Sequence, residues 1–173
     1  MGSRAAVDQT LTRLVREGML LRVGRGMYAL PIQSRFGVRP PATQAVVQAM
    51  ESANGEVIVD SGASEANALG LTTQVPVREV FLTSGPSRTL QLGSRTVDLQ
   101  HSKRWLWALG KRPAGRAIRA LSWLGPENGA HALKVLHTQL AAEEWTAMRA
   151  ARPMLPSWMA RAVGEASEVG AGG

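Results

Sequence analysis

Apolar residues recur every three or four positions between residues 3 and 17, which predicts an amphipathic helix there. Ser3 is a favourable N-cap at its start, and Gly18 is a favourable residue for its end. The apolar stripe consists of Val7, Leu11, Leu14 and Val15. The polar side chains expected to lie away from this stripe are Arg4, Gln9, Thr12, Arg13 and Arg16.

Two short apolar segments follow this helix and flank Gly24-Arg25-Gly26. Short strands joined through glycines predict a β-hairpin with Arg25 at its tip, and Pro31 ends it. A polar helix followed by an arginine-tipped hairpin is typical of the second half of a winged helix-turn-helix. Such a unit would place its helix in a major groove and Arg25 on the phosphate backbone or in the minor groove. The alternative is a packing element that binds no ligand.

The rest of the chain predicts a mixed α+β unit whose C-terminal half is helical. Residues 32–41 contain two consecutive prolines and are interpreted as a linker. Residues 84–87 are expected to form the turn between two neighbouring strands. The expected elements are helix 42–53, strand 56–59, helix 63–70, strands 79–83, 88–92 and 95–99, and helices 114–124, 130–150 and 157–163.

The net charge of +7 is concentrated in two segments. Residues 1–40 contain seven arginines against Asp8 and Glu17, and residues 101–123 contain six basic side chains and no acidic one. Concentrated basic charge indicates a polyanionic partner, with nucleic acid favoured over an anionic membrane. A solvated basic surface is the alternative.

The second basic segment also contains Trp105, Trp107 and Trp123. Arginines beside aromatic rings are able to bind phosphates while the rings stack on bases. We favour a role in the core for the tryptophans, with Arg116 and Arg119 beside the buried helix face rather than within it. The role of this segment stays open at the level of sequence.

Several classes of function lack the residues that they require. The chain has no cysteine, which excludes disulfides, cysteine-ligated zinc and thiol catalysis, and its three histidines make a metal site unexpected. No cofactor is expected either, because no phosphate-binding loop is present. No apolar run approaches 18 residues and the first residues do not resemble a signal peptide, so we expect a cytoplasmic protein without a membrane partner.

One catalytic alternative involves Asp60-Ser61-Gly62, which follows three apolar residues. This pattern resembles the active-site strand and loop of retroviral-type aspartic proteases, which need two aspartates sharing one proton and hence a homodimer. However, residues 65–70 favour a helix where such a protease continues as a strand. We therefore expect no catalytic residue and no enzyme, with Asp60 at a strand end and Ser61 or Ser64 capping a helix.

Six segments together resemble the AbiEi-type antitoxins and transcriptional regulators of type IV toxin–antitoxin systems. They are residues 2–9, 14–18, 22–28, 61–76, 83–88 and 119–125. The resemblance implies a winged helix that binds operator DNA and represses its own operon, followed by an antitoxin domain that opposes a nucleotidyltransferase-like toxin, with or without direct contact. The first half of that winged helix has no counterpart in this sequence, so we expect the native chain to start upstream of Met1 or to be truncated.

The sequence therefore predicts an α+β protein with a partial winged-helix DNA-binding element at 1–31, a linker at 32–41, an antitoxin-like regulatory domain at 42–163 and a disordered tail at 164–173. Arg4, Gln9 and Arg13 are expected to contact bases or phosphates, and Arg25 to contact DNA from the hairpin tip. The full set of expected DNA-binding residues is Arg4, Gln9, Thr12, Arg13, Arg16, Arg22 and Arg25. Two alternatives remain: the aspartic-protease homodimer, and an antitoxin that contacts protein only. A homodimer of the regulator also stays open.

Overall fold

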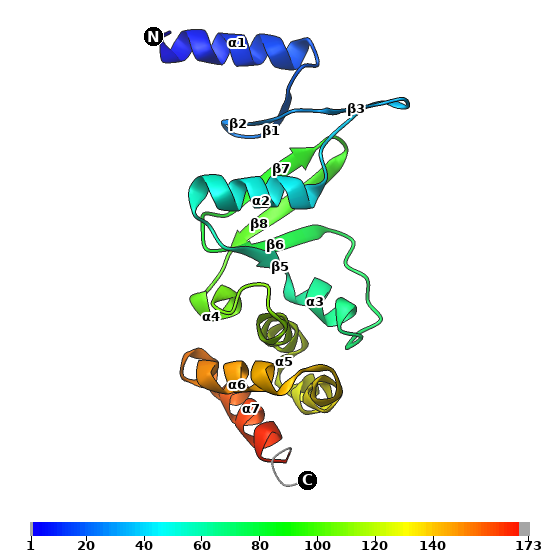
Figure 1. Ribbon diagram of the computed structural model, residues 1–173, viewed down its shortest axis with the longest axis vertical. Coiled ribbons are helices and arrows are strands. Elements are labelled where there is room, and N and C mark those ends of the chain that lie inside the picture. Colours follow the sequence, from blue (N-terminus) through cyan, green and yellow to red (C-terminus); the bar gives the residue numbers. More distant parts are fainter. Residues whose placement is uncertain (1, 170–173) are drawn as a thin grey trace.

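The computed structural model describes residues 2–169. Its architecture is mixed α+β with a helical C-terminal half, which confirms the predicted fold class. The molecule is elongated, with helix α1 (Arg4–Arg16) at one end and helix α7 (Ser157–Val169) at the other (Figure 1). The strands and the helices of the first half lie between α1 and the C-terminal helices.

The predicted helix and hairpin at the start of the chain are confirmed. The hydroxyl of Ser3 caps α1 by accepting a hydrogen bond from the backbone N–H of Ala6 at 3.3 Å. Strands β1 (Leu21–Gly24) and β2 (Met27–Ala29) pair antiparallel. Gly26 has a φ of +67° at the tip, a conformation that glycine adopts without strain.

A second hairpin occupies most of residues 32–41, where the sequence had indicated a linker. Strand β3 (Ile32–Ser34) pairs antiparallel with β4 (Gly37–Arg39). The prolines flank these strands and do not interrupt them, so the strand N–H groups remain able to pair. The proline signal therefore marked the ends of a hairpin and not an unstructured connection.

The central sheet has four strands in the order β5-β6-β8-β7. Strands β6 and β8 are parallel, and the two outer pairs are antiparallel. The expectation that residues 84–87 join neighbouring strands is wrong, because β8 lies between β6 and β7. The sheet region consists of α2 (Thr43–Asn54), β5 (Ile58–Asp60), α3 (Gly62–Ala68), β6 (Glu79–Thr83), β7 (Arg88–Leu92) and β8 (Arg95–His101).

The first hydrophobic core lies between this sheet and α2, and the β1–β2 hairpin contributes to it. Val23 of β1 is only 2% exposed, so one face of that hairpin is fixed to the sheet. The buried members are Val23, Val46, Val47, Met50, Ile58, Phe81, Leu90, Leu92, Val97 and Leu99. Because buried apolar area stabilises the fold by about 25 cal/mol per Å², this contact anchors the base of the hairpin.

The helical half is built by α4 (Arg104–Trp107), α5 (Pro113–Gln139), α6 (Ala142–Ala151), the 3₁₀ turn η1 (Arg152–Met154) and α7. The single helix expected over 130–150 is divided, because Leu140 and Ala141 adopt extended backbone conformations. Helix α7 continues to Val169, so residues 164–169 are helical and not a disordered tail. The rest of the predicted tail, 170–173, lies outside the described residues.

A buried ion pair joins α3 to the helical half. The guanidinium of Arg119 on α5 donates to the carboxylate of Glu65 on α3 at 2.7 Å, and the two side chains are 1% and 3% exposed. Arg116 donates to the other carboxylate oxygen at 2.8 Å. The expectation that Arg119 lies beside the buried face is wrong, because its charge has a buried partner 54 positions away in sequence.

Candidate nucleic-acid interface

Helix α1 lies clear of the sheets at one end of the molecule (Figure 1). None of its residues is buried, and Val7 in the predicted apolar stripe is 50% exposed. The other three stripe residues, Leu11, Leu14 and Val15, are only half-buried. Helix α1 therefore presents nearly its whole circumference to solvent.

Four of the five candidate side chains on α1 share one face. Residues three or four positions apart lie on the same side of a helix, which brings Gln9, Thr12, Arg13 and Arg16 together opposite the apolar stripe. Arg4 does not join them, because the seven-residue spacing to Leu11 places both on the stripe side. The expectation that Arg4 lies away from the stripe is therefore wrong, although its side chain is exposed.

Local contacts leave most of this face available. The guanidinium of Arg13 lies 3.9 Å from the carboxylate of Glu17, a contact between exposed side chains. Such surface pairs contribute at most about 1 kcal/mol, so a phosphate is able to displace this carboxylate. The hydroxyl of Thr12 donates to the carbonyl of Asp8 at 2.8 Å, so Thr12 offers only acceptor capacity to a ligand.

The β1–β2 hairpin combines an anchored base with a free tip. Arg22 and Arg25 are exposed, whereas Val23 between them is buried in the sheet core. Arg22 is paired with Tyr28, and the register shifts between Arg22 and Gly24, so β1 is irregular at Val23. Arg25 lies beyond the last strand pair, between Gly24 and Gly26, where no side chain of those neighbours covers it.

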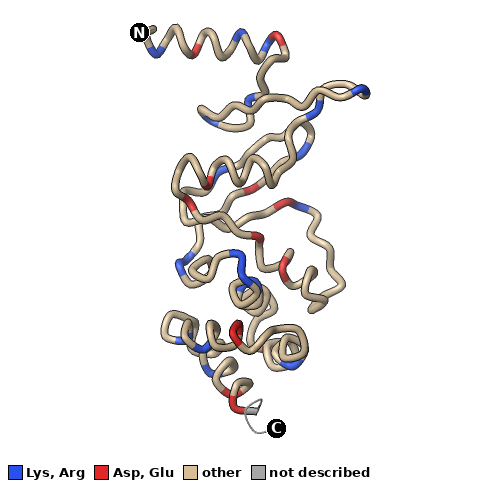
Figure 2. The backbone as a smooth tube through the Cα atoms, viewed as in Figure 1, with Lys and Arg blue, Asp and Glu red and all other residues tan. Residues whose placement is uncertain are grey.

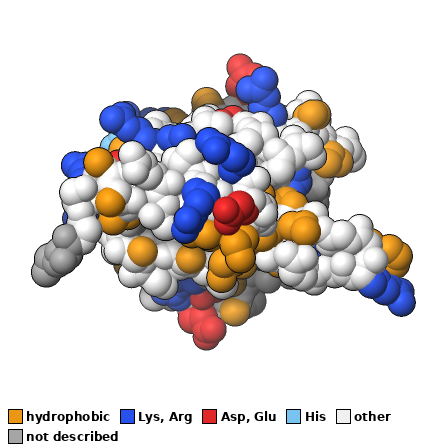
Figure 3. Space-filling model, turned by 90° about the horizontal axis from the view of Figure 1, so that it is seen from above, with side chains coloured by type: hydrophobic (Ala, Val, Ile, Leu, Met, Phe, Trp, Pro, Cys, Tyr) orange, Lys and Arg blue, Asp and Glu red, His pale blue; other side chains and the backbone are white. Residues whose placement is uncertain are grey.

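Basic charge dominates the end of the molecule that carries α1 and the two hairpins (Figure 2). No acidic residue occurs between Glu17 and Glu51, while four arginines do. Two of these, Arg35 and Arg39, lie in the β3–β4 hairpin, and sequence analysis left them out of the site because that segment was interpreted as a linker. The space-filling view onto this end shows basic side chains on its surface, with the β3–β4 hairpin projecting sideways (Figure 3).

The second basic segment, 101–123, is different because its charges are largely paired within the protein. Lys111 contacts Glu51 at 2.6 Å, Arg112 contacts Glu144 at 2.9 Å, and Arg116 and Arg119 share Glu65. The hydrogen bonds from Arg112, together with one from the backbone of Ala114, hold the pKa of Glu144 below its ordinary value. Trp123 is 42% exposed, and Trp105 and Trp107 are half-buried.

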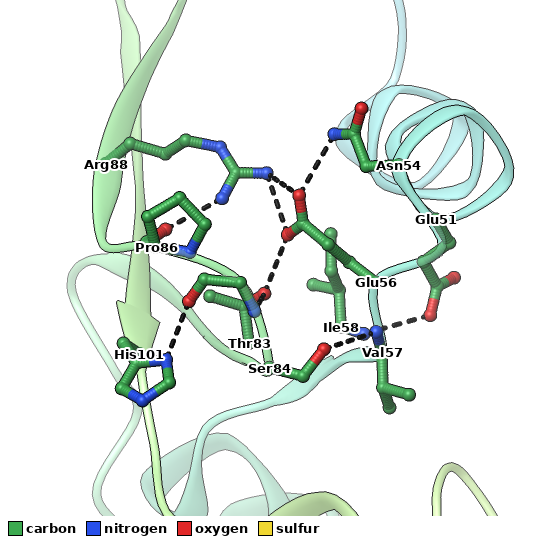
Figure 4. Close-up of polar contacts among 11 residues, drawn as sticks. Glu51, Asn54, Glu56, Val57, Ile58, Thr83, Ser84, Pro86, Arg88 and His101 are labelled. Carbon is green, nitrogen blue, oxygen red and sulfur yellow. Dashed lines mark hydrogen bonds and ion pairs between the residues drawn. The ribbon is translucent and has the colours of Figure 1, made fainter.

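The segment 83–88 also has a structural role, which centres on Glu56 (Figure 4). Arg88 donates to both carboxylate oxygens of Glu56, at 2.6 and 2.8 Å, and Thr83 and Asn54 donate to the same group. Burial raises the pKa of Glu56, but these hydrogen bonds outweigh it and hold the pKa below the ordinary value. A Cβ at Gly85 would overlap the Glu56 carboxylate, which explains the glycine.

Asp60 lies at the end of β5, and helix α3 begins two residues later, as the sequence predicts. Ser61 is the N-cap, with its hydroxyl accepting from the backbone N–H of Ser64 at 3.4 Å. Asp60 borders a cleft of about 430 Å³. Burial raises the pKa of Asp60, and the negative charge of Glu65 raises it further. The positive charges of nearby basic residues, Arg119 foremost, lower it but do not cancel the increase.

The raised pKa of Asp60 predicts a pH-dependent effect of Asp60→Asn. A carboxyl group whose pKa is raised in the folded state stabilises the fold when the pH is below its unfolded-state pKa, which is near 3.8. This stabilisation is lost as the pH rises through the folded-state pKa. The neutral amide removes that loss, so the variant is expected to be more stable than wild type at pH 7, with a smaller difference at pH 4. Urea denaturation at both pH values measures this.

Glu144→Gln is the matched control. The pKa of Glu144 is lowered in the folded state, so the effect of its substitution on stability at pH 7 has the opposite sign. Its contribution is present above about pH 4.5 and lost as pH falls, so this variant should be less stable than wild type at pH 7. A loss of stability in Asp60→Asn at pH 7 would contradict this account. Peptide cleavage by wild type that disappears in Asp60→Asn would support the protease alternative instead.

Residues 2–169 contain no group of three or more histidine, aspartate or glutamate side chains arranged to hold a metal ion. No helix within the same range combines the length and the apolar character needed to cross a bilayer.

The chain belongs to a protein family described as a family of unknown function, DUF6088, whose family model matches residues 1–144. The match includes α1, both hairpins, the central sheet and all of α5. Comparisons with curated proteins and with solved structures gave no match.

Proposed function

We propose that this protein binds duplex DNA through α1 and the β1–β2 hairpin, and that it is an antitoxin and transcriptional autoregulator of an AbiEi-like type IV toxin–antitoxin operon. The observation that carries the DNA-binding part is the exposed α1 beside an arginine-tipped hairpin whose base is buried in the sheet core. The proposal places the protein in the cytoplasm, where it would meet an operator.

The dimensions of α1 suit a major groove. A helix of 13 residues is about 20 Å long and 10–12 Å wide, and the major groove of B-DNA is about 12 Å wide. Because α1 is attached to the body only at its C-terminal end, its polar face is free to enter the groove. Gln9 would meet base edges there, while Arg13 and Arg16 would contact phosphates.

The antitoxin part of the proposal rests on the resemblance of segments 61–76, 83–88 and 119–125 to AbiEi-type proteins. One structural observation supports treating the first and the third of these segments as one unit. Glu65 in the first segment and Arg119 in the third form the buried ion pair between α3 and α5. The opposing nucleotidyltransferase-like toxin would be a functional partner, whether or not it contacts this chain.

Two substitutions separate base reading from backbone contact. Gln9→Ala should cost about 1–3 kcal/mol of binding free energy on the operator alone, because an amide bonds adenine through two hydrogen bonds. Arg25→Ala should weaken binding to all duplexes by similar factors and reduce the salt slope by about one unit. Titration of both variants with operator and scrambled duplex at two salt concentrations measures both effects.

Arg161→Ala is the matched control, because Arg161 is an exposed arginine on α7 at the opposite end of the molecule. This variant should keep the affinity and the salt slope of wild type. If Gln9→Ala and Arg25→Ala also leave both affinities unchanged, α1 and its hairpin do not read DNA. The half-exposed apolar stripe of α1 then favours the antitoxin that contacts protein only.

A further inference from the structure

The hairpin formed by β3 and β4, residues 32–39, is called the arm below. It projects sideways from the end of the molecule that carries α1 (Figures 1 and 3). Every residue of its two strands is exposed, and its strands pair only with each other. The arm therefore adds no buried residue to the core between the sheet and α2.

Local hydrogen bonds hold the tip of the arm in a defined turn. The hydroxyl of Ser34 donates to the carbonyl of Gly37 at 2.9 Å and accepts from the backbone N–H of Phe36 at 3.2 Å. Gly37 has a φ of +109°, which a residue with a side chain would rarely adopt. The tip is preformed, so little conformational entropy would be lost when it binds a ligand.

This turn presents an aromatic ring and an arginine to solvent. Phe36 is 86% exposed, and the guanidinium carbon of Arg35 lies 4.7 Å from the centre of its ring. Val38 on β4 is also 57% exposed. Apolar side chains of this size are usually buried, so their exposure on a projecting hairpin indicates a contact surface.

The charge around these apolar side chains favours a polyanion as the occupant. Arg35 lies at the tip and Arg39 at the base of the arm, and no acidic residue occurs from residue 18 to residue 50. The β1–β2 hairpin and the arm extend in opposite directions within the layer below α1 (Figure 1). A duplex lying along this layer would therefore extend from the hairpin that carries Arg25 towards the arm.

We infer that the arm is a second DNA contact, in which Phe36 inserts between base pairs from the minor groove while Arg35 lies in the groove. Apolar wedges flanked by arginines act in this way in minor-groove proteins, where they partly unstack a base step and kink the duplex by about 20–90°. This inference rests on the proposed DNA binding and adds a consequence, a bend in the bound duplex. The basic surroundings are the reason to prefer DNA over a second copy of this chain.

The test uses a duplex of the operator region labelled at both ends with a donor and an acceptor dye. Wild type should increase energy transfer on binding, because a kink brings the ends together. Phe36→Ala should bind about 5- to 150-fold more weakly, as expected for one lost stacking contact, and leave the bound duplex straight. Phe36→Trp should restore the kink. The control Val77→Thr, at a fully exposed apolar residue outside the arm, should keep it.

The outcomes distinguish this inference from the proposed function. Gln9→Ala should lower affinity without changing energy transfer in the saturated complex, because it acts through α1. If wild type binds DNA but leaves it straight, or if Phe36→Ala bends it equally, the arm inference is wrong and the proposed function stands. If wild type binds no duplex, both are wrong. A dimer in solution that Phe36→Ala dissociates, with DNA bending unchanged, would assign the arm to self-association and overturn the inference.

Discussion

Glu65→Gln should lower the free energy of unfolding by about 3–5 kcal/mol, the usual cost of removing one partner from a buried ion pair. The substitution leaves the positive charge of Arg119 buried at 1% exposure without its carboxylate. The remaining partners of that guanidinium are the carbonyl groups of Leu106 and Gly110, at 3.2 and 2.9 Å. Backbone carbonyls carry only partial charge, so they compensate the guanidinium incompletely.

Urea denaturation of the variant measures this change, and the melting temperature should fall by roughly 6–20 °C for a chain of this size. The double variant Glu65→Leu with Arg119→Met should recover much of the loss, because it removes both buried charges and retains apolar volume. Lys111→Met is the surface control and should cost less than about 1 kcal/mol, since the side chain of Lys111 is 52% exposed. A Glu65→Gln variant as stable as this control would contradict the account.

The second large effect is expected for Gly62→Ala, at the first position of α3. A Cβ at this position would lie 2.5 Å from the carbonyl oxygen of Arg119 and 2.7 Å from the Cβ of Trp123. The carbonyl belongs to the backbone of α5, so relief requires α3 and α5 to separate. Overpacking of this kind costs about 1–3 kcal/mol.

Gly164→Ala on α7 is the matched control for a helical glycine in a crowded place. Its Cβ would meet the guanidinium of Arg152, 2.7 Å away, and this flexible group is able to move. Alanine favours helix over glycine by about 1 kcal/mol, which offsets the rearrangement. Chemical denaturation should therefore show a clear loss for Gly62→Ala and little change for Gly164→Ala. Equal effects would mean that close contact between α3 and α5 is not what requires Gly62.

Local signals in the sequence were sufficient for most helices and strands. Helix α1 and the β1–β2 hairpin follow from periodicity, from the N-cap Ser3 and from the glycines around Arg25. The β3–β4 hairpin was missed because the prolines flanking it were interpreted as signs of irregular structure. The signal available was Gly37, a turn residue between two short segments that contain the β-favouring residues Ile32 and Val38.

Features that depend on distant partners were not accessible from the sequence. The order of strands in the sheet depends on β8 entering between β6 and β7, and a turn-like segment at 84–87 does not reveal this. The burial of Arg119 depends on Glu65, which is far away in the chain. In the candidate interface, the exposure of the arginines on α1 follows from the helical pattern of the sequence. The burial of Val23 in the sheet core could not be predicted in this way, because it depends on how the hairpin packs against the sheet.

The most direct test of the central claim is a titration of the wild-type protein with the duplex upstream of its own gene, between about 50 and 200 mM salt. If Arg13, Arg16, Arg22 and Arg25 each neutralise one phosphate, log K against log salt should fall with a slope of about −3.6. Operator duplex should also bind more tightly than a scrambled duplex at every salt concentration. An affinity that does not change with salt, or the absence of binding to either duplex, would contradict the claim that α1 and the β1–β2 hairpin form a DNA-binding surface.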